Sequence, residues 1–309
     1  MVVLRPGEEV AGYVIVRALG GGRQGTVYLA RHPRLPRGVA LKVIHDGFSG
    51  DPKTRASFDR EVELVSRLDH PNVVAVYDRN GLEDTHLWLS MRYVAGGDLA
   101  ALLGGAPGGL DPDRAALLIA GTAQALDYAH GQGVLHRDVK PLNILLEHHN
   151  GAERPVLTDF GIARALDDTV TASGIVATFA YAAPERFTSA NVGHRSDVYS
   201  LGCTLFQLLT GYIPYPAKDP AAAIYAHVNE PIPSPRDRCP NLPPYLDAVL
   251  TTALAKNPRR PIPHLCSTGH RCRSCAHYDC LRTRPTTADG LEGIPTSPRH
   301  RPRSNKLDG

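Results

Sequence analysis

The sequence predicts an α+β fold of two lobes, in which a small β-rich lobe with one helix precedes a larger α-helical lobe. Three observations predict this. Short strand-like runs occupy residues 13–44, one helical stretch follows at 52–68, and the chain changes to long Ala/Leu-rich helical segments after Gly96 and Gly97. A chain of 309 residues with 42% hydrophobic side chains can build a core of this size.

The first lobe is predicted over residues 1–94. Strand-like runs at 13–16, 26–30 and 39–44 are separated by turns rich in Gly, Pro and Arg, which favours an antiparallel sheet. Residues 52–68 have apolar side chains at helical spacing, so we expect one amphipathic helix there. Two further strand-like runs follow, around 73–77 and 87–94.

The second lobe is predicted over residues 95–260, with long helices at 112–130 and 197–210. The lobes should join near 92–97. No apolar run is long enough for a membrane span, and the first residues do not resemble a secretory signal, so we expect a cytoplasmic protein. Residues 255–309 carry 11 Lys and Arg against 4 Asp and Glu, so this segment is basic, while the rest of the chain is mildly acidic with 23 against 27. We expect no nucleic-acid partner.

A glycine-rich motif lies between the first two strand-like runs. Gly20, Gly22 and Gly25 fit G-x-G-x-x-G-x-V, with Val27 at the last position. Glycines allow a backbone to approach phosphates and donate N–H groups to them. Because a strand follows instead of a helix, a Rossmann turn is disfavoured, and the residues after Gly25 do not fit a Walker A loop. A plain glycine-rich hairpin is the alternative.

Charged residues with an expected role follow in order. Lys42 lies in an apolar strand and needs an anionic partner when buried, for which Glu61 on the following helix is the candidate. The segment from His136 to Asn143 fits H-R-D-x-x-x-x-N, the most specific pattern in the chain. Asn143 and Asp159 carry the oxygen ligands that Mg²⁺ prefers.

These residues together resemble the signature set of protein kinases over about residues 13–260. The chain looks like a bacterial, eukaryotic-like (Hanks-type) serine/threonine kinase, which implies the two-lobe protein-kinase fold. The resemblance implies that Asp138 accepts the proton of a substrate hydroxyl and that Lys42 contacts ATP and pairs with Glu61. Lys140, two residues after Asp138, is the pattern of serine/threonine kinases.

The resemblance also implies cofactors, namely ATP with Mg²⁺ or Mn²⁺ held by Asn143 and Asp159. A hinge is expected at residues 91–94 with Met91 as gatekeeper, and the backbones of Arg92 and Val94 would bind adenine. Arg92 stands where an acidic residue is common in the family. From above, Val27 and Ala40 would cover the adenine.

Regulation is expected in the segment 159–185, which resembles an activation loop and ends in Ala-Ala-Pro-Glu. Thr169, Thr171 and Ser173 are the candidate phosphosites, with Thr171 preferred, and Arg137 would pair with the phosphate. The resemblance further implies protein substrates with Ser or Thr, autophosphorylation, and a kinase dimer that acts in trans. Asp197 should brace the catalytic loop.

The resemblance stops near residue 260, where either of two arginines, Arg259 or Arg260, could pair with Glu185. Residues 261–309 are rich in Cys, His, Arg and Pro, a composition that predicts disorder. We weigh a basic tail that contacts acidic partners, a frame-shifted ending, and a zinc site. The candidate zinc ligands are Cys266, His270, Cys272, Cys275, His277 and Cys280.

Two other functions remain open at this point. A pseudokinase scaffold would commonly lack one of Lys42, Asp138, Asn143 and Asp159, and all four are present. A small-molecule phosphotransferase is disfavoured by the peptide-binding elements around Thr178. Many relatives continue into a membrane span and a sensor domain, so we expect this chain to be a soluble member or to have lost that continuation.

Overall fold

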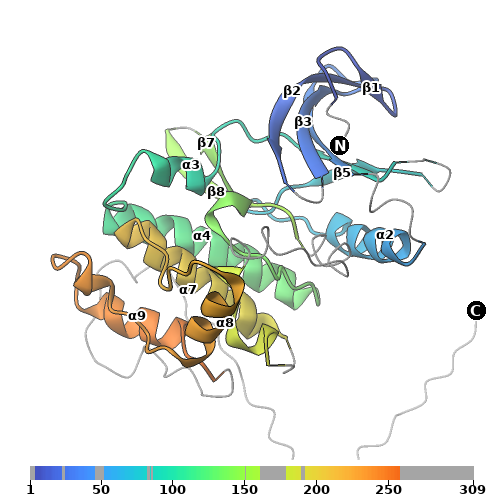
Figure 1. Cartoon of the computed structure of the whole chain (residues 1–309). Coiled ribbons are helices and arrows are strands. Elements are labelled where there is room, and N and C mark those ends of the chain that lie inside the picture. Colours follow the sequence, from blue (N-terminus) through green and yellow to red (C-terminus); the bar gives the residue numbers. More distant parts are fainter. Residues whose placement is uncertain are drawn as a thin grey trace, which may run out of the picture. The chain divides into compact units, whose positions relative to one another are not determined.

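The first lobe is a six-stranded antiparallel sheet with one helix on it (Figure 1). The computed structural model describes residues 4–22, 25–45, 52–81, 84, 86–149, 151–160, 179–188 and 192–257. The strands run in the order β1-β2-β3-β4-β6-β5. Their bounds are Glu9–Val10 (β1), Tyr13–Gly21 (β2), Gly25–Arg31 (β3), Gly38–Ile44 (β4), Val76–Arg79 (β5) and Trp88–Arg92 (β6).

The helix of this lobe is α2, Pro52–Ser66, which agrees with the predicted helix at 52–68. Its apolar face divides between two cores. Phe58 and Val62 pack with the sheet, whereas Val65 packs with the apolar cluster of the second lobe. A movement of α2 therefore changes contacts in both lobes.

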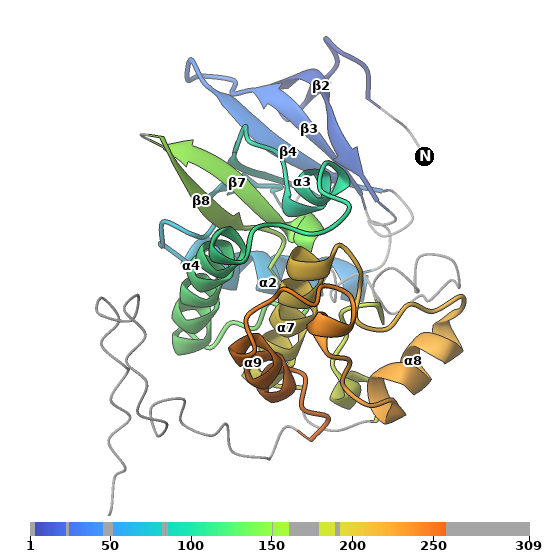
Figure 2. The same cartoon turned by 90° about the vertical axis from the view of Figure 1, so that its left-hand side faces the viewer.

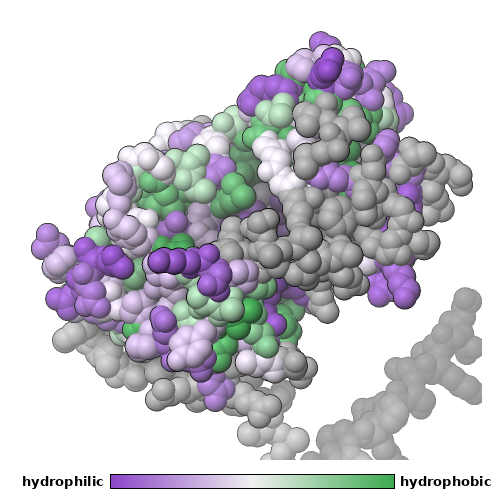
Figure 3. Space-filling view, viewed as in Figure 1, coloured by the Kyte–Doolittle hydropathy of each residue, from purple (hydrophilic) through white to green (hydrophobic). Residues whose placement is uncertain are grey.

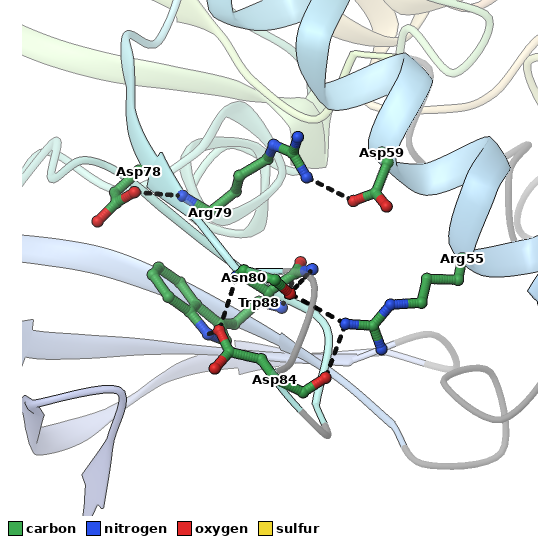
Figure 4. A network of polar contacts seen from close by, with 8 residues as sticks. Arg55, Asp59, Asp78, Arg79, Asn80, Asp84 and Trp88 are labelled. Atoms are coloured by element: carbon green, nitrogen blue, oxygen red, sulfur yellow. Dashed lines mark hydrogen bonds and ion pairs between the residues drawn. The ribbon is translucent and has the colours of Figure 1, made fainter.

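Polar contacts tie α2 to the turn between β5 and β6 (Figure 4). Arg79 Nη1 lies 2.6 Å from Asp59 Oδ1, and Arg55 Nη2 donates to the backbone carbonyls of Gly81 and Asp84 at 3.1 and 2.7 Å. These contacts fix the amino-terminal half of the helix on the sheet that carries Lys42.

The second lobe is helical, as expected, and contains a β-hairpin that lies beneath the sheet of the first lobe (Figure 2). The hairpin strands are β7, Ile144–His149, and β8, Ala152–Leu157. Its described helices are α3 (Leu99–Gly104), α4 (Pro112–Gly131), α7 (His194–Thr210), α8 (Pro220–Asn229) and α9 (Tyr245–Ala253). The predictions of helices at 112–130 and 197–210 are confirmed.

Short 3₁₀ turns at Pro141–Asn143, Pro184–Arg186 and Pro235–Asp237 join these elements. The main core contains buried side chains of α4, α7 and α9 together with the β7–β8 hairpin. On the face drawn in Figure 3, hydrophilic and hydrophobic side chains are mixed over both lobes. Within the described part of the chain, no helix combines the length and hydropathy that crossing a membrane requires.

Candidate active site

The predicted catalytic residues of the loop after α4 lie together. Lys140 Nζ is 2.7 Å from Asp138 Oδ2, and Asn143 Nδ2 donates to the backbone carbonyl and to Oδ2 of Asp138, at 2.7 and 3.0 Å. The tight turn Pro141–Asn143 produces this arrangement because it folds the chain back toward Asp138. The three side chains thus form one polar cluster around a single carboxylate.

Asp197 on α7 braces this loop from below, as the resemblance implied. Its carboxylate, 1% exposed, accepts the backbone N–H groups of His136 at 2.9 Å and Arg137 at 2.7 Å, and it lies 2.8 Å from His130 Nε2. Burial would raise the pKa of Asp197, but the hydrogen bond from His130 and its other donors outweigh burial and lower it. Arg137 has φ +66°, a left-handed conformation that this carboxylate stabilises.

The ion pairs that Lys42 and Glu61 form differ from the prediction. Lys42 Nζ lies 2.9 Å from Asp159 Oδ1, and Glu61 Oε1 accepts from Arg137 Nη1 at 3.3 Å. The prediction that Lys42 pairs with Glu61 is therefore wrong for this structure. The physical reason is that two cations and two carboxylates meet here, and either pairing offsets the cost of burying the charges.

The carboxylate of Asp159 is held at the end of β8 by its neighbours. Burial would raise its pKa, but the charge and hydrogen bond of Lys42 outweigh burial and lower it. The next residue, Phe160, is buried and packs against the ring of His136 with centroids 4.6 Å apart. His136 Nε2 lies 2.8 Å from the carbonyl of Thr158, so the catalytic loop is joined to the segment that carries Asp159.

The glycine motif forms the end of the β2–β3 hairpin, with Gly20 opposite Val27 and Gly21 opposite Thr26. Its glycines differ in their surroundings. A Cβ on Gly25 would lie 2.4 Å from the carbonyl oxygen of Val43, whereas Cβ atoms on Gly20 and Gly22 would meet nothing within 4 Å. Gly25 is therefore required by packing, and the other two glycines face open space.

Apolar residues predicted to contact adenine gather in one cluster, which contains Ala40, Met91 and Val94, with Val27 packed against it. Ala40 and Met91 are directly opposite each other on β4 and β6. Sequence reasoning missed Leu145 of β7, which packs against the same cluster from the second lobe. The signal that could have found it is the apolar run Ile144-Leu145-Leu146, which directly follows Asn143.

Two oxygen donors fit a divalent cation. The amide nitrogen of Asn143 is bound to Asp138, which leaves its oxygen as the ligand atom, and Asp159 has a second carboxylate oxygen beyond the one near Lys42. A hard cation held by few protein oxygens and by phosphate suits this donor set. In the described parts of the chain, no group of three or more His, Cys, Asp or Glu side chains could hold a metal by itself.

Several predicted residues lie outside the described residues. They are Thr169, Thr171, Ser173, Thr178, Arg259, Arg260, and the candidate zinc ligands of the tail. Glu185, the expected partner of Arg259 or Arg260, is 5% exposed and accepts a hydrogen bond from Ser196 Oγ at 2.6 Å. Arg186 Nη1 donates to the carbonyl of Arg137 at 2.9 Å, a contact that sequence reasoning did not predict.

Comparisons with known proteins agree with this geometry. A family model described as protein kinase domain matches residues 13–262. The chain is 49% identical over 262 residues to serine/threonine-protein kinase PknJ of Mycobacterium tuberculosis, covering 83% of this chain and 44% of PknJ. It is 43% identical over 288 residues to PknF of the same organism, covering 90% of this chain and 60% of PknF.

A solved structure gives the same result for the fold. The crystal structure of the Mycobacterium tuberculosis PknI kinase domain matches with a TM-score of 0.64 and 35% identity, covering 83% of this chain and 93% of that one. The chain spans about half the length of the curated relatives it matches.

Proposed function

Because the chain belongs to the protein kinase family, and within it to the bacterial Hanks-type kinases, we propose that it transfers the γ-phosphoryl group of ATP to Ser and Thr hydroxyls of proteins. The observation that carries this proposal is the cluster of Asp138, Lys140 and Asn143. It offers a carboxylate as proton acceptor with a cation 2.7 Å away, in a loop braced by Asp197.

Each residue has a role in this proposal. Asp138 orients the substrate hydroxyl and accepts its proton, and Lys140 neutralises charge near the transferred group. The open side of the glycine motif leaves room for phosphates, and Lys42 contacts them. A divalent metal ion, for which we propose Mg²⁺ or Mn²⁺, would be held by Asn143 and Asp159 and would neutralise charge on the phosphate oxygens.

Activity is tested with the full chain. We expect incorporation of phosphate from Mg-ATP into the chain itself or into a general substrate protein, and a loss of at least about a thousandfold in Asp138→Asn. Equal incorporation by both proteins would contradict the catalytic role of Asp138. Binding of nucleotide with no phosphate transfer by the wild-type chain would favour a pseudokinase scaffold instead.

We propose autophosphorylation of the activation loop as a finer feature of this function. Arg137 supports it, because it directly precedes Asp138 in the catalytic loop and its guanidinium, which pairs with Glu61 at 3.3 Å, would pair with a phosphate instead. Mass spectrometry after incubation with Mg-ATP should find phosphate on Thr171, or on Thr169 or Ser173. Mixing active chain with Asp138→Asn chain tests the proposed action in trans, since only trans phosphorylation would modify the inactive copy.

A further inference from the structure

A three-residue ion cluster joins the end of β6 to the β7–β8 hairpin. Arg92 Nη1 lies 2.8 Å from Glu147 Oε1, and Arg154 Nε donates to Glu147 Oε2 at 3.0 Å, with a second contact from Arg154 Nη2. Glu147 and Arg154 are directly opposite each other on β7 and β8. We call Arg92, Glu147 and Arg154 the hinge clamp.

The clamp is partly shielded from water, because the side chains of Arg92 and Glu147 are 26% and 25% exposed. Burial would raise the pKa of Glu147, but its two arginine partners outweigh burial and lower it. The carboxylate is therefore charged at neutral pH. A charge-assisted network in which one carboxylate meets two guanidinium groups is more rigid than an isolated surface pair.

The same strand β7 also holds the linker that leaves the hinge. Gly96 N donates to the carbonyl of Leu146 at 3.1 Å, and Leu146 N donates to the carbonyl of Gly97 at 2.9 Å. A Cβ on Gly96 would lie 2.2 Å from Leu146 O, so this close approach requires glycine. The segment 92–97 is thus fastened to β7 at both of its ends.

Both sides of the clamp carry residues of the apolar adenine cluster. Met91 and Val94, on either side of Arg92 in the chain, belong to that cluster. Leu145, two positions before Glu147, packs against it. The Arg92–Glu147 contact therefore fixes how far the hinge stands from the β7 floor of the cluster.

We propose that Glu147 and Arg154 are positioning residues for the nucleotide, which hold the hinge at a set distance from β7 through the side chain of Arg92. The proposal rests on the proposed function, since it assigns the adenine to this cluster. It also accounts for an arginine at a position where the family commonly has an acid, because Glu147 supplies the opposite charge.

The test compares Glu147→Gln and Arg92→Gln with the wild-type full chain. The Kd for a non-hydrolysable ATP analogue, and KM for ATP, should rise about three- to tenfold in each variant, because a partly exposed ion network contributes modestly. At saturating ATP, kcat of Glu147→Gln should stay within about twofold of the wild-type value. The double variant should lose no more affinity than Glu147→Gln alone, since that substitution already breaks the contact with Arg92. Arg92→Lys, which keeps the charge, should recover most of the affinity.

A matched control lies on the same hairpin. Arg114 of α4 binds Glu153 of β8 with two contacts of 2.8 and 2.7 Å, at 39% and 27% exposure. Glu153 directly precedes Arg154 on β8, so the side chains of these two neighbours point to opposite faces of the hairpin. Glu153→Gln should cost similar thermal stability and leave nucleotide affinity unchanged.

Two results would overturn the proposal. One is an unchanged Kd in both Glu147→Gln and Arg92→Gln, and the other is an equal loss of affinity in Glu153→Gln. In these cases a wild-type chain that binds the analogue and transfers phosphate still supports the kinase function. A wild-type chain that binds no nucleotide would contradict both.

Discussion

Glu61 of α2 meets Arg137 of the catalytic loop, with 3.3 Å between Arg137 Nη1 and Glu61 Oε1, while Lys42 lies 2.9 Å from Asp159. The kinase resemblance implies a different pairing, Lys42 with Glu61, and an Arg137 that binds phosphate. The two sets of pairs use the same four side chains. Exchanging them would free Arg137 for a phosphate and Asp159 for a metal ion at little net cost in charge.

The first prediction concerns this exchange. Glu61→Gln should lower kcat by at least about tenfold, because the neutral side chain cannot hold Lys42 in the exchanged arrangement. The free energy of unfolding should change by less than about 1 kcal/mol, since the pair with Arg137 is partly exposed. Steady-state kinetics and chemical denaturation measure both quantities.

The control is Glu63→Gln on the same helix, whose partner Arg67 is a solvent-exposed neighbour one turn away. It should change neither quantity. If Glu61→Gln retains the kcat of Glu63→Gln, Glu61 takes no part in catalysis and the exchange is not needed.

The second prediction concerns Asp197, which is buried and accepts from two backbone N–H groups of the catalytic loop. Asp197→Asn should destabilise the fold by roughly 2–4 kcal/mol, because an amide group leaves one of these donors facing a nitrogen. Activity should fall further than the folded fraction does, since Arg137 loses the contact that holds its left-handed backbone. Asp127→Asn, on the exposed side of α4, is the control and should have neither effect.

The third prediction separates the glycines of one motif. Gly25→Ala should destabilise the fold by roughly 1–3 kcal/mol, because its Cβ would lie 2.4 Å from the carbonyl oxygen of Val43. Gly20→Ala should leave stability within about 0.5 kcal/mol and raise KM for ATP, since its methyl group would enter the open side of the hairpin. Thermal unfolding and ATP titrations distinguish the two. Equal loss of stability in both variants would show that the motif is only structural.

Short spacings explain what could be predicted from the sequence. Asp138 and Asn143 meet because a single 3₁₀ turn separates them, and the helix 52–68 follows from its apolar period. Ion pairs between residues distant in the sequence could not be predicted. Lys42 and Arg137 both carry one positive charge, so the sequence does not decide which of them pairs with Glu61. The contact of Arg92 with Glu147 spans 55 positions and leaves no periodic signal.

Some elements of the second lobe also escaped prediction, for a related reason. Helix α9, Tyr245–Ala253, lies in a proline-rich stretch, and its nine residues are too few for a clear helical period. Its packing comes from Leu246 and Leu250, which are buried in the main core. Tertiary contacts rather than local pattern decide the conformation there.

The last prediction is a dependence of stability on pH that arises at His227 of α8. This side chain is fully buried, with Nδ1 2.9 Å from the hydroxyl of Tyr199 and its ring 4.9 Å from that of Tyr215. Lys256 Nζ donates to its backbone carbonyl at 2.8 Å. Burial, and then the charge of Lys256, lower the pKa of His227 to about 4.

The sign follows from the two states. Between pH 6.5 and 4 the unfolded chain binds a proton at this histidine and the folded chain does not, so stability falls as the pH is lowered through this range. The loss should reach roughly 3 kcal/mol at pH 4, from 1.36 kcal/mol for each pH unit. Above about pH 7.5 the imidazole is almost entirely neutral in both states and contributes little slope.

His227→Asn removes the titrating group and can keep a hydrogen bond to Tyr199. Its free energy of unfolding, measured by denaturant titration, should fall less steeply than that of the wild type between pH 6.5 and 4.5. Between about pH 7.5 and 8.5 the two curves should run nearly parallel, with a constant offset from the lost packing. If they also run parallel below pH 6.5, then His227 is not the source of the acid sensitivity, and the paired carboxylates near the cleft become the groups to examine.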